Sequence, residues 1–125
     1  MINVLIVEDN ELNRDLLTRR LERNGYRVSC AVDGPQGIEM AQSVEPDIIL
    51  MDVALGEIDG WEATLAIHAN PATANIPVIA LTAHALESDR LKSIEVGCVD
   101  FETKPVSLPE LIRKIEQHAL GRPQA

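Results

Sequence analysis

Five polar side chains stand at the ends of short apolar segments, and their types suggest a common chemistry: Glu8, Asp9, Asp52, Thr82 and Lys104. Two carboxylates about 5 Å apart repel each other by roughly 3 kcal/mol at an effective dielectric near 20. Three carboxylates that meet with only one lysine must therefore bind a cation or a proton. Oxygen ligands in an open, hydrated site favour Mg²⁺. With a lysine and a hydroxyl alongside, such a site suits a phosphoryl group, and attack by Asp52 would give an aspartyl phosphate.

Each of these residues also has a simpler explanation when it is taken alone. Glu8 and Asp9 would be a solvated pair at the start of a helix, where negative charge is favourable. Thr82 would be a hydroxyl bonded to backbone at a strand end, and Lys104 an exposed lysine before a turn. Only a fold that gathers all of them in one place overturns these readings.

Apolar segments alternate with amphipathic ones along the whole chain, which is typical of an α/β fold. Strands are expected at 3–7, 27–31, 48–51, 76–81 and 99–103. Helices are expected between 10 and 24, from 33–35 to before Pro46, from 61 to about 70, from about 86 to 96, and from 107 to about 120. In the helix at 86–96 we expect Leu91 and Ile94 to face inward.

This alternation predicts a parallel sheet with helices on both faces. Right-handed crossovers and the chain length favour a five-stranded, doubly wound sheet of order 2-1-3-4-5 with five helices. The carboxyl ends of its strands would then bring the five polar residues together at one edge, where open α/β sheets carry their chemistry.

Composition narrows the possible functions. The chain has 125 residues, of which 46% are hydrophobic and 25% charged, as in a globular domain with a real core. The net charge of −9 argues against a nucleic-acid partner. No apolar segment reaches a membrane-spanning length and no signal peptide is recognisable, so we expect a cytoplasmic protein without a membrane partner. Cys30 and Cys98 are interpreted as core residues in a reducing compartment.

The motifs VLIVEDN (4–10), ILMD (49–52), DG (59–60), ALTA (80–83) and KP (104–105) together make the chain similar to a known family. It resembles the receiver domain of two-component response regulators, which has a flavodoxin-like fold. The match extends from residue 3 to about 120. We therefore expect one receiver domain over residues 1–120 and a short tail at 121–125.

The resemblance implies a role for each residue at the predicted site. Asp52 would accept a phosphoryl group from a histidine kinase or a histidine phosphotransfer protein. Asp9, Asp52 and the carbonyl of Ala54 would bind Mg²⁺, with Glu8 acting through water. The protein would thus be a signalling phosphoacceptor that assists its own phosphorylation and dephosphorylation, and not an enzyme acting on other substrates.

The resemblance also implies how the phosphoryl group is held and read out. Thr82 would bond a phosphoryl oxygen, and Lys104, often followed by a cis bond to Pro105, would pair with the phosphoryl group. We expect the charge of Lys104 to be useful only once phosphate is bound. Phe101 takes the place of the aromatic switch residue that follows Thr82 inward. Ala54 and His84 flank the path of water to the phosphorus.

We expect a stand-alone regulator, a monomer or weak dimer, that signals to a downstream protein target through its last two helices and last strand. A receiver domain cut from a hybrid kinase is an alternative. From other classes, an FMN carrier of the same fold would need a glycine- and hydroxyl-rich phosphate loop where Glu8 and Asp9 stand. An aspartate-nucleophile phosphatase would need an acid two residues after Asp52, where Ala54 stands.

Overall fold

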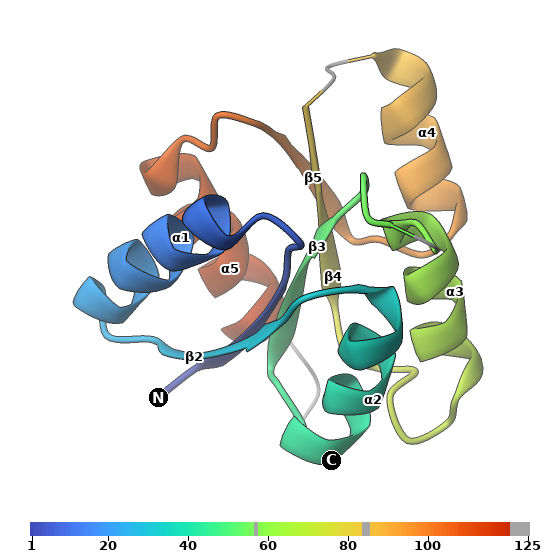
Figure 1. Ribbon diagram of the computed structural model, residues 1–125, viewed down its shortest axis with the longest axis horizontal. Coiled ribbons are helices and arrows are strands. Elements are labelled where there is room, and N and C mark those ends of the chain that lie inside the picture. Colours follow the sequence, from blue (N-terminus) through green and yellow to red (C-terminus); the bar gives the residue numbers. More distant parts are fainter. Residues whose placement is uncertain (57, 84–85, 121–125) are drawn as a thin grey trace.

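The computed structural model describes residues 1–56, 58–83 and 86–120 of the chain. Within these residues, five parallel strands form one sheet of order β2-β1-β3-β4-β5, as predicted (Figure 1). The strands are β1 (Asn3–Val7), β2 (Arg27–Ala31), β3 (Ile48–Asp52), β4 (Val78–Thr82) and β5 (Asp100–Thr103). The helices between and after them are α1 (Glu11–Arg23), α2 (Gly34–Val44), α3 (Gly60–Ala69), α4 (Glu87–Glu95) and α5 (Leu108–Leu120).

The helices cover both faces of the sheet (Figure 1). On one face, Leu21 of α1 and Leu111 and Ile115 of α5 pack against alternate residues of β1 and β3. On the other face, Ala41 of α2 and Ile67 of α3 pack against the intervening residues. Both β3 and β4 are buried along their whole length, and up to their polar last residues, Asp52 and Thr82, they are continuous apolar runs with no alternation.

Local sequence explains where the first three helices begin. Asn10, Asp33 and Asp59 each accept a hydrogen bond from the backbone N–H three residues later, at 3.0, 2.8 and 2.8 Å. These side chains satisfy helix N–H groups that have no partner within the helix. Two of the caps, Asn10 and Asp59, lie beside the predicted site and fix α1 and α3 there.

Two strands begin later than predicted, and β3 and β4 each end one residue later than predicted, at Asp52 and Thr82. β4 begins at Val78 and not at residue 76, because Pro77 has no N–H for the ladder. The carbonyl of Pro77 still accepts a hydrogen bond from Ile49 N of β3, at 2.9 Å. β5 begins at Asp100 and not at residue 99. The expected tail at 121–125 lies outside the described residues.

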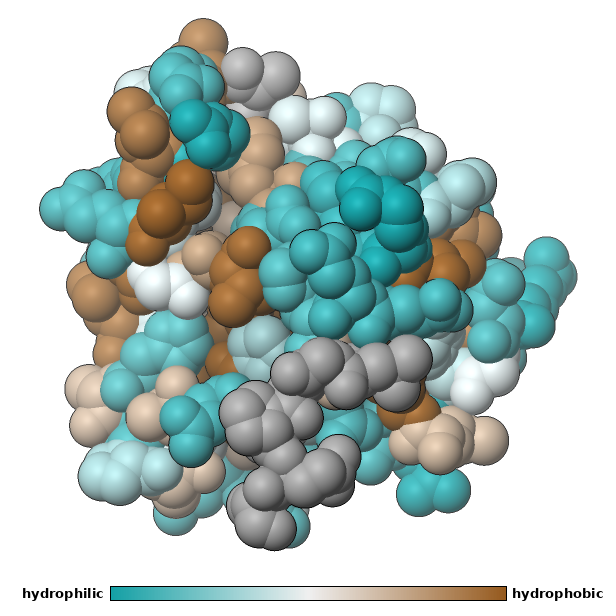
Figure 2. Space-filling view, turned by 180° about the vertical axis from the view of Figure 1, so that it is seen from behind, coloured by the Kyte–Doolittle hydropathy of each residue, from teal (hydrophilic) through white to brown (hydrophobic). Residues whose placement is uncertain are grey.

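The expected orientation of α4 is wrong. Leu91 and Ile94 are 54% and 51% exposed, whereas Ser93 is fully buried. The helix therefore presents a polar side chain to the protein and its apolar side chains to solvent. In Figure 2, hydrophobic side chains are exposed at the upper left, where α4 lies.

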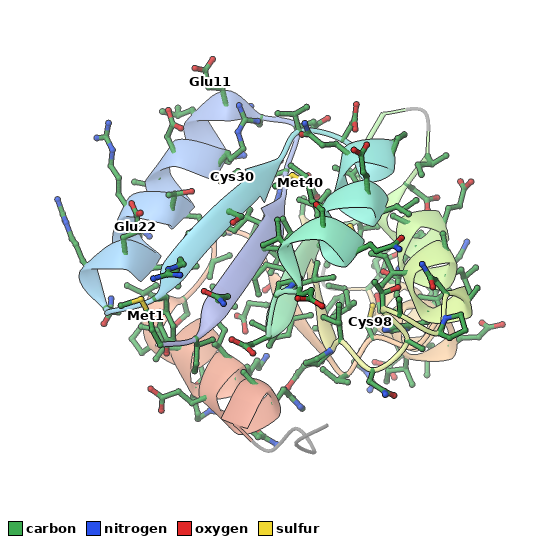
Figure 3. The ribbon with its side chains drawn as sticks, turned by 90° about the horizontal axis from the view of Figure 1, so that it is seen from below. Met1, Glu11, Glu22, Cys30, Met40 and Cys98 are labelled. Carbon is green, nitrogen blue, oxygen red and sulfur yellow. The ribbon has the colours of Figure 1, made fainter. Side chains whose placement is uncertain are left out.

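The two cysteines are free thiols well apart from each other (Figure 3). Cys98 is buried, and burial raises the pKa of its thiol to about 11, although a hydrogen bond with Thr64 acts in the opposite direction. Cys30, on the edge strand β2, is half-buried and lies 3.2 Å from Thr18 Oγ1. Among the described helices, none combines the length and the apolar character that a membrane crossing needs.

Candidate functional site

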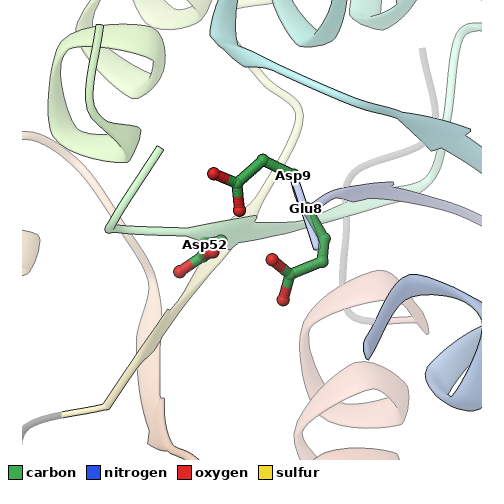
Figure 4. A group of neighbouring side chains, drawn as sticks. All are labelled: Glu8, Asp9 and Asp52. Atoms are coloured by element: carbon green, nitrogen blue, oxygen red, sulfur yellow. The ribbon is translucent and has the colours of Figure 1, made fainter. Parts of the chain in front are cut away.

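Three carboxylates meet at the carboxyl edge of the central strands. Glu8 and Asp9 directly follow β1, and Asp52 is the last residue of β3. One carboxylate oxygen from each lies within 4.8 Å of the others, and the side chains point into a common space (Figure 4). Glu8 and Asp52 are 4% and 3% exposed, while Asp9 is open to solvent. The predicted acidic residues are thus brought together, with one side accessible.

Lys104 provides the positive charge at this cluster. Its Nζ lies 2.8 Å from Glu8 Oε1 and 3.2 Å from Asp52 Oδ1. Burial alone would lower the pKa of Lys104, but the hydrogen bond to Glu8 and the charge of Asp52 raise it above its ordinary value. The lysine is therefore protonated at neutral pH. The expectation that its charge serves only a bound phosphate is wrong, because it already neutralises two buried carboxylates.

Backbone contacts hold Lys104 and Thr82 next to each other. Thr82 ends β4, is 4% exposed, and accepts a hydrogen bond from Lys104 N at 2.7 Å. The peptide bond between Lys104 and Pro105 is cis, as the resemblance implies. The hydroxyl and the ammonium group therefore come from neighbouring strand ends at the same edge as the carboxylates.

The segment after Asp52 is closely packed against β3. Ala54 N donates to Asp52 Oδ1 at 3.1 Å, and Gly60 N donates to Val53 O at 3.0 Å. A Cβ atom at Gly60 would overlap the carbonyl oxygen of Asp52, so this position needs glycine for close backbone approach. Ala54 is exposed beside the carboxylate cluster.

The expected switch residue Phe101 lies one strand further along the sheet. It pairs with Ala80 in the ladder between β4 and β5, and its ring is half-buried against the core on the α2–α3 face. Its movement with Thr82 remains a prediction. His84 lies outside the described residues.

Sequence reasoning missed two features beside the site. Arg14 Nη1 donates to the carbonyl of Glu8 at 2.9 Å, which ties the first turn of α1 to the acidic pair. In the sequence, the position of Arg14 one helical turn after the Asn10 cap could have indicated this contact.

A hollow of about 180 Å³ also opens from Glu8 and Lys104 between α1 and the segment after β5. Its other lining residues are Asn13, Leu16, Leu17, Arg20, Leu81, Pro105 and Val106.

A carboxylate cluster with a lysine and a hydroxyl, at the switch point of a doubly wound sheet, defines a signalling phosphoacceptor. The chain belongs to the response regulator receiver domain family, whose family model matches residues 4–116.

Similar proteins support this assignment. The polar-differentiation response regulator DivK of Brucella anthropi is 37% identical over 116 residues, covering 93% of this chain and 94% of DivK. The receiver domain of the sensor histidine kinase PA1611 of Pseudomonas aeruginosa is 37% identical, with a TM-score of 0.87 and coverage of 94% and 97%. That structure has a magnesium ion coordinated in its active-site cleft.

A third comparison is a co-crystal structure from Saccharomyces cerevisiae. It contains the histidine phosphotransfer protein Ypd1 and the receiver domain of its downstream response regulator Ssk1. The matching chain is 31% identical, with a TM-score of 0.86, and the alignment covers 95% of this chain and 89% of that chain.

Proposed function

We propose that Asp52 accepts a phosphoryl group from a histidine kinase or a histidine phosphotransfer protein. The observation that carries this proposal is the convergence of Glu8, Asp9 and Asp52 with Lys104 at the carboxyl edge of the sheet. The PA1611 receiver with magnesium and the Ypd1–Ssk1 complex support the same chemistry for this family.

The transfer would be an in-line displacement at phosphorus. An oxygen of Asp52 attacks, the P–N bond of the donor phosphohistidine breaks, and the departing imidazole takes up a proton. Asp52 Oδ1 already contacts Ala54 N and Lys104, so we expect Oδ2 to be the attacking oxygen. Lys104 and the hydroxyl of Thr82 would then bind the oxygens of the transferred group.

The donor set fits Mg²⁺, since it consists of carboxylate oxygens with an open side. Asp9, Asp52 and the carbonyl of Ala54 would hold the ion, and Glu8 would act through water. When bound, the ion neutralises charge on the phosphoryl oxygens.

Incubation with Mg²⁺ and acetyl phosphate, followed by intact mass measurement and peptide mapping, tests this function. We expect one phosphoryl group, located on Asp52. A stable modification on another residue would contradict the proposal. Bound flavin colour would instead favour an FMN carrier, and turnover of a chromogenic phosphate ester would favour a phosphatase.

Removing one metal ligand should weaken Mg²⁺ binding. We expect wild type to bind Mg²⁺ with a dissociation constant on the order of micromolar to millimolar, and Asp9→Ala at least about tenfold more weakly. The fluorescence of Trp61 follows the titration, because Trp61 is the second residue of α3, directly after the site loop. Asp15→Ala, an exposed aspartate on α1, is the matched control. If Asp9→Ala titrates like wild type, the ligand assignment is wrong.

Replacing Lys104 should separate its two roles. We expect Lys104→Ala to lower the melting temperature without Mg²⁺, because Glu8 and Asp52 lose their cation, and added Mg²⁺ to restore most of this loss. Binding of a partner protein that depends on phosphorylation should stay defective in both conditions. Lys114→Ala is the control, since Lys114 pairs with Glu102 at 2.8 Å away from the site and its loss should not respond to Mg²⁺.

A melting loss in Lys104→Ala that Mg²⁺ leaves unchanged, together with normal partner binding, would contradict this division of roles. The lysine would then be a purely structural ion-pair partner.

We also propose that the phosphoryl group on this protein decays slowly. Ala54 is exposed beside Asp52 but has no polar group that could orient an attacking water. Ala54→Asn should speed decay by about tenfold, because an amide there can position the water. Decay can be followed on Phos-tag gels, with Ala66→Asn, an exposed alanine of α3, as the control. Faster decay in wild type than in Ala54→Asn would shift attention to His84 as the hydrolytic helper.

Two surfaces suit the proposed partners. The hollow beside α1 opens onto Glu8 and Lys104, so a donor segment lying in it would bring its histidine near Asp52. On the opposite side of the site, exposed Leu91 and Ile94 give α4 an apolar surface that suits a downstream protein target.

A further inference from the structure

The attachment of α4 to the rest of the protein is unusually polar. Of the nine residues of α4, all of which the structure describes, Ser93 is the buried one. Leu91 and Ile94 are more than half exposed, and the N-cap residue Leu86 makes no side-chain cap. Hydrophobic burial along the helix therefore holds α4 less firmly than it holds α3 or α5.

One residue of α3 contacts this polar face. Trp61 Nε1 donates a hydrogen bond to Ser93 Oγ at 2.9 Å, and Ser93 Oγ donates to the carbonyl of Asp89 at 2.9 Å. The ammonium group of Lys92 lies 4.6 Å from the centroid of the Trp61 ring, within cation–π range. Ser93 thus uses its hydroxyl as both acceptor and donor, and Trp61 contacts two neighbouring residues of α4, Lys92 and Ser93.

Trp61 is in turn fixed to the phosphoacceptor strand. Its neighbour Gly60 donates to Val53 O at 3.0 Å and lies so close to the Asp52 carbonyl that no Cβ fits between them. Asp59 caps the same helix. At its other end α4 follows Thr82 within a few residues along the chain. The helix is therefore connected to both sides of the phosphoacceptor site.

We infer that the hydrogen bond from Trp61 to Ser93 holds α4 in the unphosphorylated position and breaks when Asp52 carries a phosphoryl group. This inference rests on the proposed function. A phosphoryl group that draws Thr82 toward Asp52 displaces the end of β4, the strand that precedes α4 in the sequence, while Gly60 keeps Trp61 in place. Water can replace both partners of the broken hydrogen bond. Trp61 and Ser93 are thus positioning residues for the apolar surface of α4.

Thermodynamic linkage gives this inference a measurable sign. If the contact exists only in the unphosphorylated state, removing it destabilises that state alone and shifts the population toward the other. By reciprocity, the variant must then bind a phosphoryl analogue more tightly. The expected factor is between about two- and tenfold, which is what one net hydrogen bond represents in an equilibrium constant.

The test titrates beryllofluoride, a phosphoryl analogue, into wild type and Ser93→Ala in the presence of Mg²⁺. We expect two- to tenfold tighter binding by the variant. Its melting temperature should be lower than that of wild type without the analogue and equal to it at saturation. Ser88→Ala is the matched control, because Ser88 is an exposed serine of the same helix and should behave as wild type.

A second variant, Trp61→Phe, removes the N–H donor and keeps an aromatic ring for Lys92. Its binding of the analogue is measured by thermal melts. It should show the same tightening, and it carries the test if Ser93→Ala does not fold. Unchanged affinity in both variants, with an equal melting loss in both states, would overturn the inference and leave the proposed function standing. Failure of wild type itself to bind beryllofluoride would overturn both.

Discussion

Asp52→Asn should abolish phosphorylation by acetyl phosphate and raise the melting temperature of the metal-free protein. The amide has the shape of the carboxylate but neither its charge nor its nucleophilicity. Mass spectrometry is expected to detect no phosphoryl group on the variant, at any time point at which wild type is modified. Asp33→Asn is the matched control, because Asp33 is exposed, caps α2 and can be replaced there by asparagine at little cost.

The stability gain follows from the charges around Asp52. Oxygens of Glu8 and Asp9 lie within 4.8 Å of it, and Lys104 lies 3.2 Å away. At an effective dielectric near 20, the two repulsions cost roughly 7 kcal/mol together and the one attraction returns roughly 5 kcal/mol, so removing the charge favours folding by about 2 kcal/mol. Burial of the carboxylate acts in the same direction.

Mg²⁺ should reverse this order of stability, because the ion binds wild type more tightly than the variant and stabilises it accordingly. Thermal melts of both proteins in EDTA and in excess Mg²⁺ measure the order of stability without and with the ion. A modified Asp52→Asn protein would contradict the assignment of the acceptor, and a lower melting temperature in EDTA would contradict the electrostatic argument.

The site residues could be predicted from the sequence because parallel topology alone determines where strand ends lie. Once β1, β3, β4 and β5 are recognised, Glu8, Asp52, Thr82 and Lys104 must share one edge of the sheet. The strand order follows from the same alternation of elements. No side-chain detail is needed for either step.

Other features depend on how helices rotate and how far side chains reach, and the sequence does not determine these. The spacing of Leu91 and Ile94 shows that they lie near each other on α4, but not that this side faces solvent. The contact of Arg14 with the Glu8 carbonyl depends on the rotation of α1. Lys104 and Glu8 are 96 positions apart in the sequence. Only the folded structure shows that this ion pair is already formed before any phosphoryl group is bound.

The reversed orientation of α4, with a polar side chain inward and apolar side chains outward, is informative for function. Full burial of a leucine or isoleucine side chain contributes about 1.5–3 kcal/mol, and a helix that leaves Leu91 and Ile94 54% and 51% exposed gives up part of this contribution at each. Local preference and global fold usually agree, and disagreements concentrate at functional surfaces. The exposed apolar side of α4 and its polar inner contact with Trp61 are therefore consistent with the two proposals made above, that this side binds a partner and that the helix shifts on phosphorylation.

Gly60→Ala should destabilise the protein strongly, although it adds only one methyl group. The new Cβ would overlap the carbonyl oxygen and carbon of Asp52 and the Cα of Val53, all of them backbone atoms at the end of the buried strand β3. Backbone cannot rotate away as a flexible side chain can. We expect a loss of about 3 kcal/mol, at the upper end for overpacked sites, and a fall in melting temperature on the order of 10 °C.

The same substitution should also damage the site, because relief of the overlap must move Asp52, the start of α3, or both. Phosphorylation by acetyl phosphate should slow even at temperatures where the variant is folded, since a displacement near 1 Å can cost about a hundredfold in rate. Gly56→Ala is the matched control, four residues earlier in the loop before α3, where an added Cβ meets no atom within 4 Å. It should keep wild-type melting and phosphorylation rates. If Gly60→Ala melts like Gly56→Ala, the strand end and α3 are not locked together, and Trp61 would lose the rigid base from which it positions α4.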